Sequence, residues 1–439
     1  MSEPRFLFVG PLATLDRTPD VRRALLDRAA SDVGESIRTA TAEIIGRVRL
    51  QGDDALRALA RELDGVELSS LEVPRAAMTR ALAELDVPLR TALERAAANI
   101  ASAHRAFMPG ATEIETEPGV IVGRRPDPLA AIGVYAPGGR GAYPSSVLMG
   151  IVPAKVAGVP NVILCSPPGR DGSLSRVVLA AAAIAGADCV FALGGAGAVA
   201  AMAYGTASVP RVARIVGPGN AYVAEAKLQV QASGVVAIDS PAGPSELLVI
   251  ADGSADPEVI AREMLAQAEH DPMTSIVLLA LDARIASEVV RLIELLLARQ
   301  PRATIIADAL KHRSAVIWSD SLDALVALAT EYAPEHLLLA GARAEARIGD
   351  IRNAGTVFVG QHSSVAYGDY MTGANHVLPT GGAARSYSGL STGDFMRWTT
   401  YQRVSPAAAA ALAADVALIA ESEHLEGHAR AARAWGRVA

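Results

Sequence analysis

The sequence predicts an α/β fold built from two domains with parallel sheets, and two series of short apolar segments are the basis of that prediction. From Ala130 onward, apolar runs that end at glycine or proline alternate with helical stretches, as in AAIGVYAPGG, NVILCSPPG, CVFALGGAG and ARIVGPGN. A second series begins after Ser240 with ELLVIAD, SIVLLAL, ATIIAD, HLLLAG and AGTVFVG. Alternation of this kind is typical of strand–turn–helix units that join into a parallel sheet. Each series is therefore expected to form one α/β domain.

Helical segments are expected at both ends of the chain. Residues from about 20 to 108 carry a helical spacing of apolar side chains, as in VRRALLDRAA and DDALRALARELDG, in which Gly65 provides a stop signal. The tail from about residue 404 also has the pattern of helix throughout. These helical pieces would flank the two α/β domains.

The composition indicates a soluble, cytoplasmic globular protein. Hydrophobic residues make up 51% of the 439 residues and charged residues 20%, which allows a large core. The net charge of −7, without a run of lysine or arginine, argues against nucleic acid and anionic membranes as partners. The N-terminus lacks the apolar core of a signal peptide, and the weakly polar stretch 177–203 is interrupted by Asp188 and several glycines. Cys165 and Cys189 sit in apolar runs, as is typical of buried thiols in strands.

Three glycine-rich turns raise the question of a nucleotide. The segment from Gly195 to Ala200, GAGAVA, follows an apolar strand and fits the G-x-G-x-x-A dinucleotide fingerprint, in which a backbone approaches a pyrophosphate at a helix N-terminus. That fingerprint also requires an acidic residue about 20 residues later, and this sequence has none there. GPGNAY at 217–222 and APGGRGAYPSS at 136–146 add further turns after strands. A phosphate-bearing cofactor and plain turn chemistry both remain open on these patterns.

Polar residues gather in four segments that are otherwise apolar or rich in glycine. LAQAEHDPMTS places Gln267 and His270 three residues apart on one face at the end of a helix, and YAPEHLLL places two polar residues just before a strand. The others are SSVAYGDYMTGANHVLPT, expected to be loop, and ESEHLEGHARA on the terminal helix. Because ligand sites in α/β sheets lie at the carboxyl ends of strands, we expect most of these residues there.

These residue types suit a divalent metal of the zinc type. Imidazole nitrogen, carboxylate and amide oxygens are its usual ligands, but no H-E-x-x-H motif occurs, so spacing does not select them. Histidines that cap surface turns are the alternative for any single position. Adjacent Glu335 and His336 have a chemical interpretation, because a histidine can take a proton from an alcohol and a carboxylate can activate water.

Several of these segments resemble histidinol dehydrogenases, in the same order along the chain. The matching motifs are DSPAGPSELLVIAD, LAQAEHDPMTS, YAPEHLLL, GDYMTGANHVLPT and EHLEGHARAA. RLQGDDALRALARELDGV, IGVYAPGGRGAYPSSVLM and GPGNAYVAEAK resemble the N-terminal and middle signatures of that family. The resemblance extends from about residue 20 to 432.

The resemblance implies an NAD-dependent enzyme with one zinc ion per subunit, which oxidises L-histidinol through L-histidinal to L-histidine and uses two NAD molecules. It also implies a homodimer with shared active sites and two incomplete Rossmann-like domains. In this sequence the expected division is an N-terminal arm at 1–24, a first α/β domain at 25–134 and 245–390 that carries zinc and the catalytic residues, a second α/β domain at 135–244 on the NAD side, and a helical dimerisation segment at 391–439.

By motif, the resemblance also assigns site residues. Glu335 and His336 would be catalytic, with His336 as the base toward the alcohol and Glu335 activating the water that attacks the aldehyde. The expected zinc ligands, which also line the substrate site together with His336, are Gln267, His270, Asp369 and His428. The remaining substrate contacts would be Ser245, His376 and Glu423.

The cofactor positions contain one departure from the family. Tyr135, Gly197 and Asn220 occupy the positions expected to contact NAD, but the family commonly has glutamine where this chain has Gly197. A side-chain contact is therefore missing there. Three other functions remain alternatives: a dehydrogenase of the same fold acting on another substrate such as a sulfonated diol, a zinc hydrolase in which Glu335 activates metal-bound water, and a non-catalytic zinc-binding protein.

Overall fold

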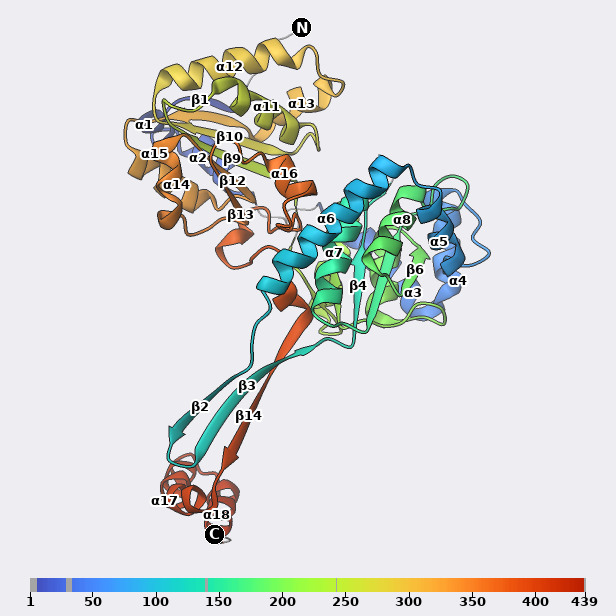
Figure 1. The fold of residues 1–439 in the computed structure, drawn as a ribbon, viewed down its shortest axis with the longest axis vertical. Helices are drawn as coiled ribbons and strands as arrows, with labels where there is room; N and C mark the ends of the chain where they lie inside the picture. Colours follow the sequence, from blue (N-terminus) through green and yellow to red (C-terminus); the bar gives the residue numbers. More distant parts are fainter. Residues whose placement is uncertain (1–5, 29–33, 139–140, 242, 438–439) are drawn as a thin grey trace.

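The computed structural model describes residues 6–28, 34–138, 141–241 and 243–437. Two α/β bodies lie beside each other, and a long ribbon of strands projects from them and ends in two helices (Figure 1). Each body contains one parallel sheet. The expected α/β fold with two parallel sheets and helical terminal pieces is confirmed.

Sheet A is parallel and six-stranded. In the order in which they lie in the sheet, its strands are β1 (Phe8–Pro11), β11 (Ala315–Trp318), β10 (Ser275–Ala280), β9 (Glu246–Ala251), β12 (His336–Ala340) and β13 (Thr356–Val359). Every residue of β9, β10 and β12 is buried, because helices cover both faces. This explains why these strands are continuous apolar runs in the sequence.

The helices of this body divide between the two faces of sheet A. Leu247 and Val249 of β9 pack toward one face, whereas Leu248 and Ile250 pack toward the other, as the two-residue period of a strand requires. The first face is covered by α11 (Pro257–Ala268), α12 (Ala283–Leu297) and α13 (Ala303–Arg313). The second is covered by α1 (Leu12–Leu15), α2 (Pro19–Leu26), α14 (Leu322–Tyr332) and α15 (Ala342–Glu345).

Sheet B is parallel and five-stranded. Its strands lie in the order β6 (Cys189–Ala192), β5 (Asn161–Ser166), β4 (Ala131–Tyr135), β7 (Arg214–Val216) and β8 (Ala237–Ile238). The connecting helices are α7 (Pro144–Val156), α8 (Arg176–Ala185), α9 (Gly195–Tyr204) and α10 (Ala221–Ala232). Cys165 is buried in β5 and Cys189 is half-buried in β6, and neither forms a disulfide.

The expected domain division is wrong for the N-terminal third of the chain. The helices α3 (Glu35–Gln51), α4 (Asp53–Leu59), α5 (Arg75–Ala83) and α6 (Val87–Ala106), with a π-helical turn at Ala60–Asp64, pack on sheet B and not on sheet A. From residues 245–390, α6 contacts part of the segment after sheet A, where Asn99 donates a hydrogen bond of 2.8 Å to the carbonyl of Met371. Ile45, Leu56 and Ile100 share one core with Val134 of β4. The apolar stripes of these helices are buried against the helices that surround sheet B, which periodicity alone does not reveal.

Two further expectations are corrected. The described part of residues 1–24 is not a free arm, because β1 pairs with β11 at the edge of sheet A and Leu15 is fully buried. The apolar run ATIIAD is the start of α13 and not a strand, since Ile306, Ala309 and Leu310 form one buried face at helical spacing. The strand of this region is β11, which follows α13.

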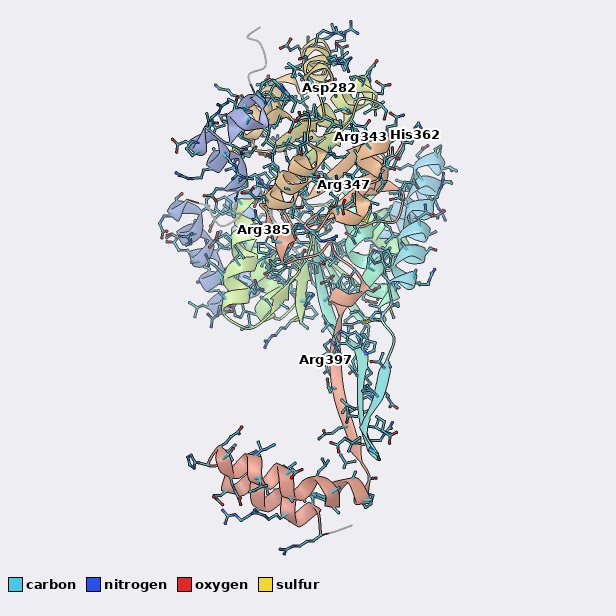
Figure 2. The ribbon with its side chains drawn as sticks, turned by 90° about the vertical axis from the view of Figure 1, so that its left-hand side faces the viewer. Asp282, Arg343, Arg347, His362, Arg385 and Arg397 are labelled. Carbon is cyan, nitrogen blue, oxygen red and sulfur yellow. The ribbon has the colours of Figure 1, made fainter. Side chains whose placement is uncertain are left out.

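An antiparallel sheet forms the projecting ribbon. Its strands lie in the order β14 (Met396–Val404), β3 (Val120–Pro128) and β2 (Thr112–Glu117). The ribbon ends in α17 (Pro406–Ser422) and α18 (Glu426–Trp435), far from both parallel sheets (Figure 1). Figure 2, turned by 90°, shows the same separation.

The helical hairpin at the end of the ribbon has almost no core of its own. Only three alanines form a buried cluster between α17 and α18. Leu418 and Ile419 are each 63% exposed. None of the helices in the described ranges is long and apolar enough to cross a membrane.

Four short helices of the described ranges remain: the first connects β12 to β13, and the other three lie between β13 and β14. They are η2 (Ile348–Asp350), α16 (Val365–Tyr370), η3 (Ala383–Arg385) and η4 (Thr392–Phe395).

Candidate active site between the two sheets

The predicted catalytic pair lies at the amino edge of sheet A, not at the carboxyl edge. His336 is the first residue of β12, directly after Glu335, and Glu246 is the first residue of β9. The connecting helices run antiparallel to the strands, so the end of α11, with Gln267 and then His270 just beyond it, returns to the same edge. The expectation of a carboxyl-edge site is therefore wrong for this sheet.

The segment after β13 completes this part of the site. Asp369 lies on the short helix α16 and not in loop as expected, while His376 follows in irregular backbone. The Nδ1 atom of His376 is 3.0 Å from the carbonyl oxygen of Asp369. The body that contains sheet A thus contributes one group of polar side chains to this region. They are Glu335, His336, Asp369, His270 and His376.

Sheet B meets this region through the start of α7. The Oγ atom of Ser146 is 3.3 Å from Nε2 of His376, and Asn375 donates a hydrogen bond of 2.8 Å to the carbonyl of Met149. Because α7 follows the carboxyl end of β4, the carboxyl edge of sheet B lies next to the amino edge of sheet A. The site lies at this junction.

The His336 ring is oriented by contacts of its Nδ1 atom. Nδ1 is 3.0 Å from the backbone oxygen of Glu246 and 3.3 Å from Oε2 of Glu335. Both atoms are acceptors, so Nδ1 carries a proton and donates it. The opposite nitrogen, Nε2, is buried without a hydrogen-bond partner and is 3.6 Å from Oδ1 of Asp369. This arrangement leaves the Nε2 lone pair of the neutral ring available to a substrate.

The two catalytic candidates influence each other's ionisation. Burial opposes protonation of His336, but the carboxylates of Glu335 and Asp369 outweigh burial and raise the pKa of this histidine well above its ordinary value. Burial also raises the pKa of the Glu335 carboxyl, although His336 and the backbone amide of Glu246 favour its charged form. The pair can therefore hold a proton between them.

Three of the four expected metal ligands come from elements of this region. Burial opposes ionisation of Asp369, but hydrogen bonding and charge from His336 outweigh burial and hold the pKa of Asp369 below its usual range. His376 and His270 act in the same direction. Gln267 is only 3% exposed, and its Nε2 position is buried without a partner.

An unpaired buried amide is costly, and a bound cation would remove that cost if the amide oxygen faced it. Amide oxygen, imidazole nitrogen and carboxylate oxygen form a donor set that suits zinc. No group of three or more His, Cys, Asp or Glu side chains within the described ranges could by itself hold a metal ion. Gln267, His270 and Asp369 are therefore the candidate ligands that this region of one chain contains.

The C-terminal candidates do not join these residues within one chain. Glu423 directly follows α17 and His428 lies on α18, both exposed, at the far end of the ribbon (Figures 1 and 2). Their expected contacts with zinc and substrate therefore require a second subunit and stay a prediction.

The expected cofactor residues lie at the carboxyl edge of sheet B, as sequence patterns predicted for that sheet. Tyr135 ends β4, and its hydroxyl accepts a hydrogen bond of 3.1 Å from the Gly195 amide at the start of α9. Burial raises the pKa of Tyr135 to about 12. Asn220 caps α10 by accepting from the amides of Tyr222 and Val223, each at 3.1 Å. These residues shape the two glycine turns.

Gly197 faces another part of the protein. A Cβ atom at this position would be 3.2 Å from Cδ1 of Leu59 and 3.6 Å from Cδ2 of Leu56. The glycine thus allows α4 to pack closely on α9, and a longer side chain here would require Leu59 to move.

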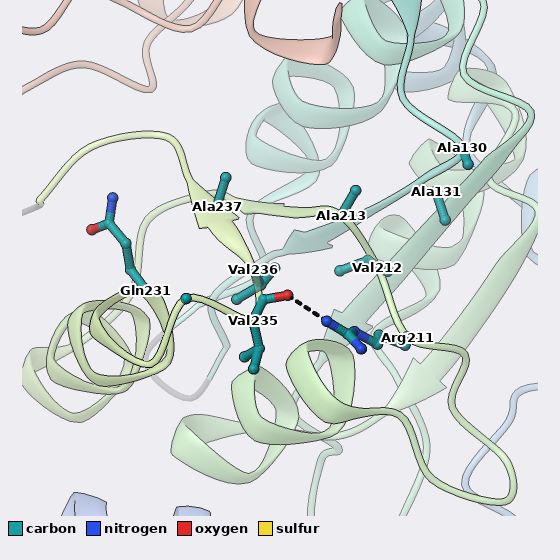
Figure 3. A pocket seen from close by; sticks show the side chains of 10 residues that line it. Ala130, Ala131, Arg211, Val212, Ala213, Gln231, Val235, Val236 and Ala237 are labelled. Carbon is teal, nitrogen blue, oxygen red and sulfur yellow. Dashed lines mark hydrogen bonds between the residues drawn. The ribbon is translucent and has the colours of Figure 1, made fainter. Parts of the chain in front are cut away.

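A hollow of about 700 Å³ lies at the opposite, amino edge of sheet B and is separate from this site. Its lining is mainly small and apolar, and Arg211 donates a hydrogen bond of 2.9 Å to the carbonyl of Val235 across it (Figure 3).

Sequence patterns missed three residues that the structure places beside the predicted ones. Glu246 is a charged residue at the start of an otherwise largely apolar strand, and this unusual position could have indicated a functional residue. Ser146 is the last residue of APGGRGAYPSS, and nothing in that pattern distinguishes it from its neighbours. Arg28 is far away in sequence, and no local pattern links it to the site.

Comparisons with known proteins give one consistent result. A family model described as histidinol dehydrogenase matches residues 26–435. The histidinol dehydrogenase of Natronomonas pharaonis is 47% identical over 420 residues, which cover 95% of this chain and 97% of that protein. That of Methanosarcina mazei is 43% identical over 422 residues, covering 94% and 96%. The crystal structure of histidinol dehydrogenase from Elizabethkingia anophelis superposes with a TM-score of 0.92 at 34% identity, covering 99% of each chain.

Proposed function

The chain belongs to the histidinol dehydrogenase family, and we propose that it oxidises L-histidinol through L-histidinal to L-histidine, with two molecules of NAD as oxidant and one zinc ion per subunit. We also propose a cytoplasmic homodimer in which each active site is shared. The observation that carries the chemistry is the buried, unpaired Nε2 of His336 beside Asp369. A base at this position can serve an alcohol whose oxygen lies near a metal held by Asp369.

In the first oxidation, His336 would take the proton of the substrate hydroxyl at Nε2 as the carbon that carries this hydroxyl loses a hydride. The Nδ1 proton stays hydrogen-bonded to the Glu246 carbonyl, so the ring keeps its orientation as its charge changes. The product of this step would be the aldehyde, with one proton released. NAD, when bound, supplies the hydride acceptor in both oxidations.

In the second oxidation, a water molecule has to be added to the aldehyde carbon before hydride can leave. Glu335 would take a proton from that water, and burial supports this role because it raises the pKa of the Glu335 carboxyl and so makes its carboxylate a stronger base. Loss of a second hydride then gives the carboxylate. Each turnover consumes one water molecule and yields two reduced cofactors.

Gln267, His270 and Asp369 would hold zinc, with His428 of a second copy of the chain as the fourth ligand. Zinc, when bound, would polarise the substrate oxygen and would offset the Asp369 charge that favours the protonated form of His336. Ser245, His376 and Glu423 would bind the remainder of the substrate. Tyr135 and Asn220 would shape the cofactor side, whereas Gly197 serves the packing of α4 on α9.

The shared site rests on the position of the C-terminal helices. Glu423 and His428 are exposed at the end of the ribbon, next to apolar side chains that this chain leaves uncovered. A second copy placed against the hairpin would bury these side chains and bring both polar residues to its own sheet A.

The proposal is tested by following NADH absorbance with L-histidinol, other amino alcohols and sulfonated diols. We expect NADH formation with L-histidinol at two equivalents per histidine formed, with little for the other compounds. Preference for a sulfonated diol would assign another substrate to the same chemistry. Absence of NADH formation with every alcohol, together with hydrolytic activity, would favour a zinc hydrolase.

A further inference from the structure

Arg28 and Glu246 form a buried ion pair that contacts both catalytic candidates through Glu246. The Arg28 guanidinium donates from Nε to Oε1 of Glu246 at 2.8 Å and from Nη2 to Oε2 at 3.3 Å. The two side chains are 1% and 3% exposed. Because desolvating two charges is costly, such a pair is stable only when its remaining hydrogen-bonding groups are also satisfied. Arg28 also donates from Nη1 to the carbonyl of Leu25 in α2 at 3.1 Å, and the other partners of the pair belong to segments next to the catalytic residues.

Glu246 contacts both catalytic residues through its backbone and its side chain. Its amide donates to Oε2 of Glu335 at 2.7 Å, and its carbonyl accepts from Nδ1 of His336. Its carboxylate accepts from the Glu335 amide at 3.3 Å and from the Gly381 amide at 3.0 Å. One residue therefore sets the position of the Glu335 carboxylate and the proton position on the His336 ring.

Arg28 holds the other end of the turn that delivers the catalytic pair. Its Nη2 donates to the carbonyl of Tyr332, the last residue of α14, at 2.8 Å, and its guanidinium lies 3.3 Å from the centre of the Tyr332 ring. The next residue, Ala333, has a φ of +53°, an unfavourable left-handed conformation for alanine. The tyrosine hydroxyl is anchored to Ser275 at 2.8 Å. Arg28 and Glu246 together hold the start and the end of this strained turn.

We propose that Arg28 and Glu246 are positioning residues for the oxidation of histidinol: neither touches substrate, but together they fix the His336 ring with its free nitrogen toward the site and aim the Glu335 carboxylate. The inference rests on the roles of His336 and Glu335 in the proposed function. A purely structural ion pair would affect how much protein is folded. A positioning pair also affects the rate of each folded site.

The test uses two conservative variants in the full-length, zinc-loaded enzyme. Arg28→Lys keeps the charge but lacks the planar fork that reaches both Glu246 and the Tyr332 carbonyl. Glu246→Gln keeps the size but converts one carboxylate oxygen to a donor, so that one of the amides of Glu335 and Gly381 loses its acceptor. A small misplacement of catalytic groups costs roughly 10- to 100-fold in rate.

We expect kcat per folded, zinc-containing site to fall by that factor in each variant, while KM for histidinol changes less than about threefold and zinc content is unchanged. Oxidation of supplied histidinal should slow together with that of histidinol, because both catalytic side chains are displaced.

A stability control separates positioning from folding. Ile293→Ala opens a cavity on α12, in the core beside sheet A and outside the network, and should lower the melting temperature without changing kcat per folded site. If Arg28→Lys and Glu246→Gln behave like Ile293→Ala, the pair is structural only and the proposal is wrong.

If either variant fails to fold, Arg28→Gln combined with Glu246→Gln removes both charges together. That double variant should fold and remain slow, and a wild-type kcat would overturn the proposal.

The failure of the proposed function has a separate signature. Unchanged histidinol oxidation in His336→Ala would remove the catalytic role itself. An inactive His336→Ala beside fully active Arg28 and Glu246 variants would remove only the positioning role.

Discussion

His104 gives a pH dependence of stability whose size follows from its surroundings. It lies in the last turn of α6, is 1% exposed, and neither ring nitrogen has a hydrogen-bond partner. The ring packs edge-on against Phe107, with 5.7 Å between the ring centres. Burial lowers the pKa of His104 from 6.5 to about 4. The folded protein therefore keeps this ring neutral under conditions in which the unfolded chain protonates it.

The sign and magnitude follow from that difference. Below pH 6.5 the unfolded chain binds a proton that the folded chain does not, so stability from this residue is complete above pH 6.5 and is lost as the pH falls toward 4. At 1.36 kcal/mol per pKa unit, the loss amounts to about 3 kcal/mol. Below pH 4 this residue contributes no further change.

The assay compares urea midpoints of the wild type and His104→Leu across this pH range, by circular dichroism. Leucine fills most of the space and does not titrate, so the variant should lack about 3 kcal/mol of acid destabilisation and become the more stable protein near pH 4.5. His312→Leu on the exposed end of α13 is the matched control and should follow the wild type. Parallel pH profiles for wild type and His104→Leu would refute the reasoning.

Three further predictions concern the site. His336→Ala should reduce histidinol oxidation by roughly 10²–10⁴-fold with zinc retained, and a loss below tenfold would remove His336 as the base. Glu335→Gln should slow the oxidation of supplied histidinal more than that of histidinol, because only the aldehyde step needs activated water; equal slowing contradicts this role. Zinc content, measured by mass spectrometry, should fall in each ligand variant and stay unchanged in His312→Ala, whereas equal loss in that control would indicate general instability. The ligand variants are Gln267→Ala, His270→Ala, Asp369→Ala and His428→Ala.

The parallel sheets could be predicted from the sequence because buried strands leave a strong local signal. The runs that form β9, β10 and β12 are apolar after their first residue, since both faces of sheet A are covered. Local signals failed where packing decides. The run ATIIAD has the same composition as a buried strand, but the spacing of its apolar residues suits one helical face of α13.

The site residues were predicted by motif, but their edge of the sheet was not. The general rule for α/β sheets describes loops that follow strands, whereas His336 and Glu246 begin their strands. Which edge carries the site depends on how the second body docks, and that contact involves residues as distant as Ser146 and His376. Pairing of Arg28 with Glu246 spans 218 positions and has no periodic signature.

The central claim is that sheet A of one chain and the C-terminal helix of another form one active site, and subunit complementation tests it most directly. His336→Ala and Glu423→Ala homodimers should each be nearly inactive toward histidinol. After the two are unfolded and refolded together, half of the sites in every heterodimer should carry neither lesion, so NADH formation should reappear in proportion to the heterodimers detected by mass or tag. Confirmed heterodimers without recovered activity would place both residues in the same chain's site and contradict the account.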